Sequence, residues 1–135
     1  MMNNMDREIR EAREAGARAL NSLRQAQSCL DSARNWGLLD LFGGGFLSTM
    51  LKHSKMDDAK RCIQQAQWDL QAFSRELQDV DLPEVELGGF MTFADYFFDG
   101  FLADFMVQQK INQAREQVDR AIRQVEAILR QLQTL

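Results

Sequence analysis

Small and apolar residues recur along residues 4–36 at alternating intervals of three and four, the spacing of a helix that packs along one side. This spacing defines two apolar seam positions in each heptad. Alanine occupies one of the two in four successive heptads, and its small side chain lets a partner helix approach closely. The same spacing returns in residues 46–79 and 100–133. The seam positions are Ile9, Ala12, Gly16, Ala19, Leu23, Ala26, Leu30 and Ala33, then Met56, Ala59, Ile63, Ala66, Leu70, Phe73 and Leu77, then Ile111, Ala114, Val118, Ala121, Val125, Ile128 and Leu132. The pattern predicts a single all-α domain over residues 1–135, an antiparallel bundle of three long helices with alanine-rich heptad seams.

Short breaks separate the predicted helices. Three adjacent glycines at 43–45 favour a turn after the first helix, and Pro83 ends the second because it disfavours helix in the residue before it. The connector, residues 79–91, leads into a short aromatic segment that we expect to be helical and to precede the third long helix. Residues 54–57 and 92–95 both have the form of a capping box, which is typical of a helix start.

The second and third predicted helices resemble one another. Aligning residues 40–78 with residues 95–133, at an offset of 55, gives 12 identical positions in 39. Heptad spacing explains matches at alanine and leucine, but it does not explain why Asp-x-Phe-x-x-Gly-Phe-Leu recurs before both helices. We therefore interpret the two stretches as a duplicated unit, an apolar lead-in followed by a long helix. If these helices run antiparallel, a pseudo-twofold axis relates the units and places their Gly-Phe-Leu segments at opposite ends of the bundle.

The two cysteines meet a simple geometric condition. In an antiparallel hairpin that turns at residues 43–45, residues whose numbers sum to about 91 lie level, and Cys29 and Cys62 satisfy this. A redox pair is one interpretation. We favour two small core residues on facing seams, because cysteine packs as a small hydrophobe and a reducing cytoplasm disfavours the disulfide.

The charge of the chain excludes several partner classes. A net charge of −4 provides no basic surface for nucleic acid or for anionic lipid. The polar, acidic first residues lack the apolar run of a secretory signal, and three aspartates interrupt the most apolar stretch, residues 87–107, which makes it a poor membrane span. We expect a cytoplasmic protein that does not bind nucleic acid.

Little in the sequence indicates catalysis or a metal site. His53 and Asp57 lie one helical turn apart, but a zinc site needs three or four protein ligands, and Lys52 and Lys55 would repel a cation. A single histidine leaves no second one to complete a catalytic triad, and the adjacent glycines lack the Gly-Lys-Ser/Thr ending of a P-loop. We expect no enzyme, no cofactor and no metal.

Four aspartates within the apolar segments have two interpretations. They cap helix starts, where carboxylates favour the positive end of the helix dipole, or they line an apolar pocket that binds a small molecule or acts as an enzyme site. The pocket interpretation concerns Asp95, Asp99 and Asp104; the fourth aspartate is Asp40. Extending the third helical seam backward places Asp104 on the inner face, where a polar residue can set register or oligomeric state.

The two aromatic, glycine-flanked segments are the strongest candidates for a binding surface. They either fold back to plug the ends of the bundle or form an exposed apolar patch. The candidate surface residues are Phe42, Phe46, Leu47, Phe97, Phe98, Phe101 and Leu102. We interpret the chain as a non-enzymatic interaction or scaffolding module, a homodimer or a binder of a protein partner. A peripheral membrane-associated or pore-forming protein is the alternative, and a membrane partner is not favoured.

Overall fold

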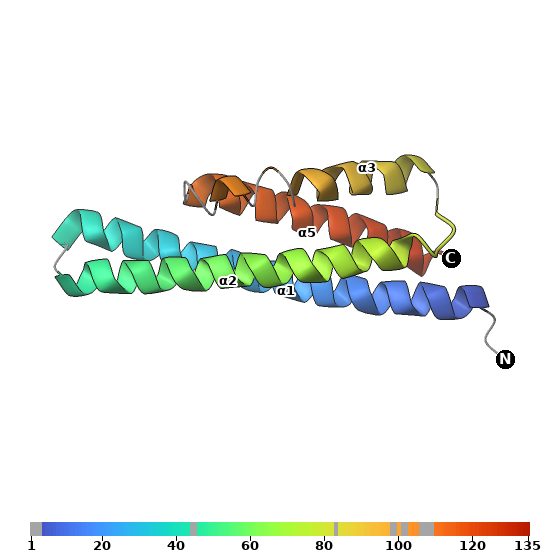
Figure 1. The fold of residues 1–135 in the computed structure, drawn as a ribbon, viewed down its shortest axis with the longest axis horizontal. Helices are drawn as coiled ribbons and strands as arrows, with labels where there is room; N and C mark the ends of the chain where they lie inside the picture. The colour runs from blue at the N-terminus through green and yellow to red at the C-terminus, as the bar shows by residue number, and fades with distance from the viewer. Residues whose placement is uncertain (1–3, 44–45, 83, 98–99, 101–102, 106–109) are drawn as a thin grey trace.

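The computed structural model describes residues 4–43, 46–82, 84–97, 100, 103–105 and 110–135, with the backbone alone for residues 36–43, 46–53 and 84–86. The helices are α1 (Asn4–Gly43), α2 (Phe46–Leu77), α3 (Glu84–Tyr96) and α5 (Ile111–Gln133) (Figure 1). Within these ranges there is no β-strand. The predicted all-α class is therefore confirmed, as are three long helices with a short helix before the third.

The four helices pack around a common core. α1 packs against α2 on one side and α5 on another, and α3 packs against both α2 and α5. Neighbouring helices run in opposite directions, whereas α2 and α5 run the same way and lie diagonally opposite one another (Figure 1). The predicted pseudo-twofold axis required the second and third long helices to run antiparallel. Because α2 and α5 run the same way, this condition is not met. The connections from α1 to α2 and from α3 to α5 lie at the same end of the bundle, because both join a helix that runs toward that end to one that leaves it.

The predicted seams form the core. The four heptad alanines of α1 and the seam residues of α5 from Ala114 to Leu132 are fully or almost fully buried. Gly16 lies where α1 meets both of its neighbours, and a Cβ added there would be 2.6 Å from Leu129 Cδ2 and 2.9 Å from Phe73 Cε1. α1 therefore has a glycine at the point where three helices converge.

Polar contacts fix the register of the helices. Ser22 Oγ donates a hydrogen bond to Asp69 across α1 and α2, and their numbers add up to 91, as predicted for this hairpin. On the other side of α1, Arg115 Nε donates to Asp31 Oδ1 over 2.6 Å. Gln27 donates to Asp119 over 2.6 Å, and Arg24 and Glu126 lie 3.6 Å apart.

The two registers together place α2 relative to α5. The three pairs between α1 and α5 have numbers that add up to between 146 and 150. A residue of α5 therefore lies level with the residue of α2 whose number is about 55 to 59 lower. This difference includes the offset of 55 in the sequence repeat, so equivalent positions of the proposed repeat lie level on two diagonal helices.

The helix ends differ from the prediction in several places. α1 continues to Gly43 and does not end near residue 36, and α5 begins at Ile111 and not near residue 100. Lys110 has an extended backbone, with φ −80° and ψ 93°, and this breaks the helix. The aligned residue in the first repeat unit, Lys55, lies inside α2. The second unit thus changes direction about ten residues later than the first.

Neither predicted capping box begins a helix. Residues 54–57 lie inside α2, and residues 92–95 lie inside α3. A cap contributes only about 1 kcal/mol, whereas burial of a continuous apolar face supplies most of the stability of a helix within a protein. The helices therefore run through these local start signals.

Candidate functional site

The first helical hairpin is longer than the second. The register between α1 and α5 places Ile111, the first residue of α5, level with α1 at about residue 36. The last part of α1 and the first part of α2 therefore extend past α5, and Figure 1 shows this end of the hairpin projecting beyond both α3 and α5. We refer to residues 36–53 as the hairpin end.

The sequence of the hairpin end is unusually apolar. Nine of its eighteen residues are large and apolar, and only Asp40 and Lys52 carry a full charge at neutral pH. Two helices packed on one another bury mainly two positions in seven, or about five of eighteen. The nine residues are Trp36, Leu38, Leu39, Leu41, Phe42, Phe46, Leu47, Met50 and Leu51. The hairpin end therefore contains about four more large apolar residues than the packing seam of a helix pair of this length uses.

The described phenylalanines of the second aromatic segment pack inward, whereas Tyr96 is 47% exposed. Phe90, Phe93, Phe97 and Phe105 are buried. The Phe90 ring meets Phe73 of α2 edge-on, with centroids 5.5 Å apart, and the Phe93 and Phe97 rings lie 6.0 Å apart. These rings fill the space between α3 and its neighbours.

The seven candidate surface residues consequently divide into three groups. Phe97 is fully buried and offers no surface to a partner. Phe98, Phe101 and Leu102 lie outside the described residues. The remaining three, Phe42, Phe46 and Leu47, belong to the hairpin end, where the backbone is helical. Sequence reasoning treated both segments alike because they share one motif, and it lacked the register that shows which hairpin is longer.

The predicted aspartate pocket is not supported by the described residues. Asp95 and Asp104 are exposed, and Asp99 lies outside the described residues. The placement of Asp104 on the inner face is wrong, because the break at Lys110 resets the helical phase on which that extension relied. The hollow beside Asp104 holds only about 10 Å³, roughly the space of one water molecule.

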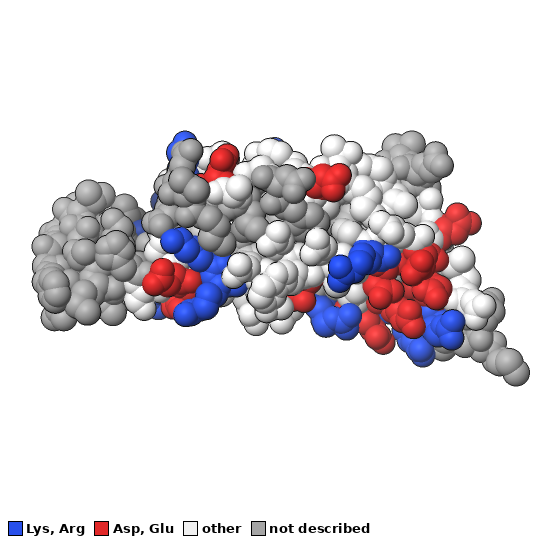
Figure 2. Space-filling view, in the orientation of Figure 1, with Lys and Arg blue, Asp and Glu red and all other residues white. Residues whose placement is uncertain are grey.

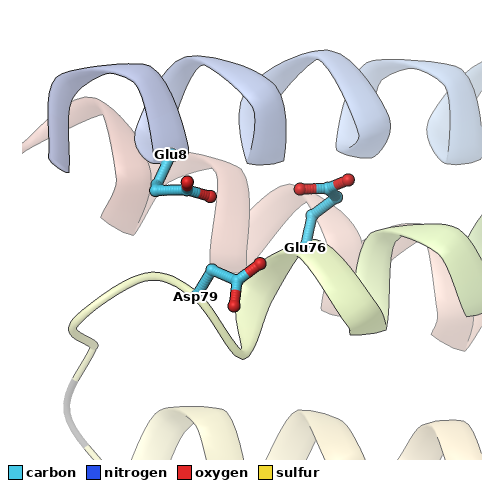
Figure 3. A group of neighbouring side chains, drawn as sticks. All are labelled: Glu8, Glu76 and Asp79. Atoms are coloured by element: carbon cyan, nitrogen blue, oxygen red, sulfur yellow. The ribbon is translucent and has the colours of Figure 1, made fainter. Parts of the chain in front are cut away.

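Three carboxylates gather where α1 begins and α2 ends. Glu8 of α1, Glu76 of α2 and Asp79 just beyond α2 have side-chain oxygens within 4.8 Å of one another (Figure 3). Glu8 and Glu76 are partly buried and Asp79 is exposed. The salt bridges found among the described residues involve none of the three. Carboxylate oxygens are the ligands that Ca²⁺ and Mg²⁺ prefer, so the cluster offers ligands of the type that a hard cation takes; like charges at this spacing repel one another.

Sequence reasoning missed this cluster because its members are far apart in the chain. The only sequence signal for the cluster was the predicted hairpin register, because this register brings the first turns of α1 beside the last turns of α2. Acidic side chains also gather near this end of the bundle in Figure 2, with basic side chains beside them.

The two cysteines face each other across α1 and α2. Both are free thiols, partly buried and packed against the core. Burial raises the pKa of the Cys62 thiol from its ordinary 9.0 to about 12, and the neighbouring Cys29 thiol adds to the rise. At neutral pH Cys62 is therefore a protonated thiol, as expected for a small residue beside a core.

The fold and these sites define an all-α helical bundle made of two antiparallel hairpins, one of which projects beyond the other. Within the described ranges, no helix is both long enough and apolar enough to cross a membrane. No family model, curated protein or solved structure matches the chain.

Proposed function

We propose that the chain is a non-enzymatic interaction module that self-associates through the hairpin end. The observation that carries this proposal is the combination of a hairpin that extends past its covering helices with a sequence of nine large apolar residues in that extension. Apolar surface without cover favours association, at roughly 25 cal/mol per Å² removed from water.

A second copy of the chain is the occupant that the sequence favours. Between about residues 12 and 35 of α1, the α1–α2 hairpin packs against α5 and, through α2, against α3. The lead-in motif before α2 recurs before α5, so we interpret α5, which packs on the hairpin, as a duplicate of α2, which belongs to the hairpin. The hairpin end of a second copy has the same shape and composition, and two copies related by a twofold axis would cover each other's apolar residues.

The size of the hairpin end limits the strength of this association. Eight residues of α1 beyond residue 35 extend for about 12 Å, so the buried area per partner falls below the roughly 800 Å² of a standard interface. We therefore expect a dimer that forms reversibly, with a dissociation constant on the order of micromolar.

Light scattering after size exclusion, over a range of protein concentrations, tests the proposal. The parent should rise from the monomer mass of 15.6 kDa toward twice that value as concentration increases. A Phe42→Ser, Phe46→Ser variant should remain a monomer with unchanged helical content by circular dichroism. Trp68→Ser is the matched control, because Trp68 is 56% exposed on α2, away from the hairpin end, and its loss should leave dimerisation unchanged. A parent that is a monomer at every concentration would contradict the proposal.

An apolar hairpin end would also favour insertion into a lipid surface, and flotation with vesicles separates the two functions. We expect the parent to remain in the protein fraction with both neutral and anionic vesicles, because the net charge of −4 offers no attraction to anionic lipid. If the parent floats with vesicles and Phe42→Ser, Phe46→Ser does not, the hairpin end is a membrane anchor.

A further inference from the structure

The positions of Cys29 and Cys62 follow from a contact observed elsewhere in the same hairpin. Ser22 of α1 and Asp69 of α2 lie within hydrogen-bond distance across the two helices. Seven residues further along α1 is Cys29, and seven residues back along α2 is Cys62. Seven residues make about two helical turns, so the cysteines occupy the same facing positions two turns further on. The Cys29 thiol is also among the neighbours that raise the pKa of Cys62, which agrees with this placement.

The seam beside the cysteines keeps α1 and α2 close together. Ala26 and Leu30 of α1, and Ala59, Ile63 and Ala66 of α2, are fully buried next to the pair. Alanine at so many seam positions permits an interaxial distance near the low end of the usual 8–10 Å range. Both thiols are only partly buried, so a small reagent can reach them from the side that faces solvent.

The local chemistry slows oxidation without opposing its product. Burial and the neighbouring Asp58 raise the pKa of Cys62, while Arg61 lowers it by less. The thiolate, which is the attacking species, is therefore scarce at neutral pH. A disulfide carries no charge, so the apolar seam that disfavours the thiolate does not disfavour the bond.

We infer that Cys29 and Cys62 are a modification site, a dithiol that a small-molecule disulfide oxidises to an intrachain bond clamping α1 to α2. One cysteine, as its thiolate, attacks a sulfur of the reagent disulfide and releases one reagent thiolate. The second cysteine, also deprotonated, attacks the protein sulfur of this mixed disulfide; the bond between Cys29 and Cys62 forms and the second reagent thiolate leaves. The protein loses two electrons and two protons, and the reagent disulfide becomes two thiols.

The bond would act mainly on the unfolded chain. It closes a loop of about 33 residues, which contains the whole hairpin end, and chain entropy predicts that the equilibrium constant for unfolding falls by a factor on the order of several hundred. By linkage, the folded chain should form the bond more favourably than the unfolded chain by the same factor. This inference does not depend on self-association.

Equilibration in glutathione buffers tests the inference directly. The parent is held at pH 8.5 in a series of ratios of reduced to oxidised glutathione, with and without denaturant, and is then alkylated and weighed by mass spectrometry. In the folded chain we expect one species that has lost two hydrogen atoms and in which peptide mapping finds Cys29 joined to Cys62. The midpoint of its oxidation should lie at a ratio of reduced to oxidised glutathione at least tenfold more reducing than the midpoint of the denatured chain. Cys29→Ser and Cys62→Ser should each carry a single glutathione instead.

Two outcomes would overturn the inference. One is a folded parent that retains both thiols, or carries glutathione on each, in buffers that oxidise the denatured chain. The other is a midpoint that is equal in folded and denatured chains, which would mean that the fold does not hold the thiols in position.

Discussion

Gly16→Ala tests the packing at the convergence of α1, α2 and α5. The added methyl carbon would lie 2.6 Å from Leu129 Cδ2 and 2.9 Å from Phe73 Cε1, both closer than carbon atoms approach in folded proteins. The Leu129 side chain is partly exposed and can rotate away, whereas Phe73 is fully buried and its ring is held by the core. The strain therefore falls mainly on Phe73.

The two effects of this substitution have opposite signs. Alanine stabilises a helix interior by about 1 kcal/mol relative to glycine. Overpacking a core costs about 1–3 kcal/mol. We expect overpacking to prevail because the Phe73 ring has no room to move, so the free energy of unfolding should fall by about 1 kcal/mol, equivalent to roughly 2–4 °C in Tm.

Gly88→Ala is the matched control. Gly88 is an exposed residue of α3, and a Cβ added there meets nothing within 4 Å. Only the gain in helix propensity remains, so this variant should be more stable than the parent by about 0.5–1 kcal/mol. Urea unfolding followed by circular dichroism measures both variants. The reasoning fails if Gly16→Ala stabilises the chain as much as Gly88→Ala does.

Three further predictions concern the polar groups of the bundle. Glu76→Gln should stabilise the chain by a few tenths of a kcal/mol at low ionic strength, because it removes like-charge repulsion within the carboxylate cluster; an equal gain in 1 M salt would rule out an electrostatic cause. Asp31→Asn removes the partly exposed contact with Arg115 and should cost less than about 1 kcal/mol in urea unfolding, so a larger loss would mean that the pair is more than a surface salt bridge. Folding raises the pKa of Cys62 from 9.0 to about 12, so the unfolded chain loses this proton at a lower pH than the folded chain does. The contribution of the protonated thiol to the free energy of unfolding is therefore complete below pH 9 and is lost as pH rises toward 12. Urea midpoints of the parent should therefore fall more steeply above pH 9 than those of Cys62→Ser, and parallel curves would contradict the assignment.

The heptad pattern predicted the core because burial follows helical periodicity. The seam alanines and leucines of all three long helices are buried, and the predicted hairpin register agrees with the contact between Ser22 and Asp69. Both results depend only on spacing and on the position of one turn, which the three adjacent glycines mark in the sequence.

Features that depend on tertiary structure could not be predicted from heptad spacing in the same way. The break at Lys110 has no proline or glycine beside it, so extending the seam backward through it misplaced Asp104. Heptad spacing is identical for parallel and antiparallel neighbours, and so it could not show that α2 and α5 lie diagonally. The meeting of Glu8 with Glu76 results from the hairpin register and leaves no local signal in either helix.

The most direct test of the account is a distance measurement between two copies of the chain. A spin label at Ser48→Cys, in a background of Cys29→Ser and Cys62→Ser, reports on the hairpin end, and a label at Thr134→Cys reports on the opposite end of the bundle. By the register between α1 and α5, Thr134 lies level with about residue 14 of α1, roughly 44 Å from the end of α1 at Gly43, so two copies that meet through overlapping hairpin ends place the Thr134 labels roughly 80 Å apart. Pulsed dipolar spectroscopy at concentrations above the dissociation constant should show a short distance between Ser48 labels and only a long one, of roughly 80 Å, between Thr134 labels. A short distance between Thr134 labels, or no dipolar coupling at either position, would contradict association through the hairpin end.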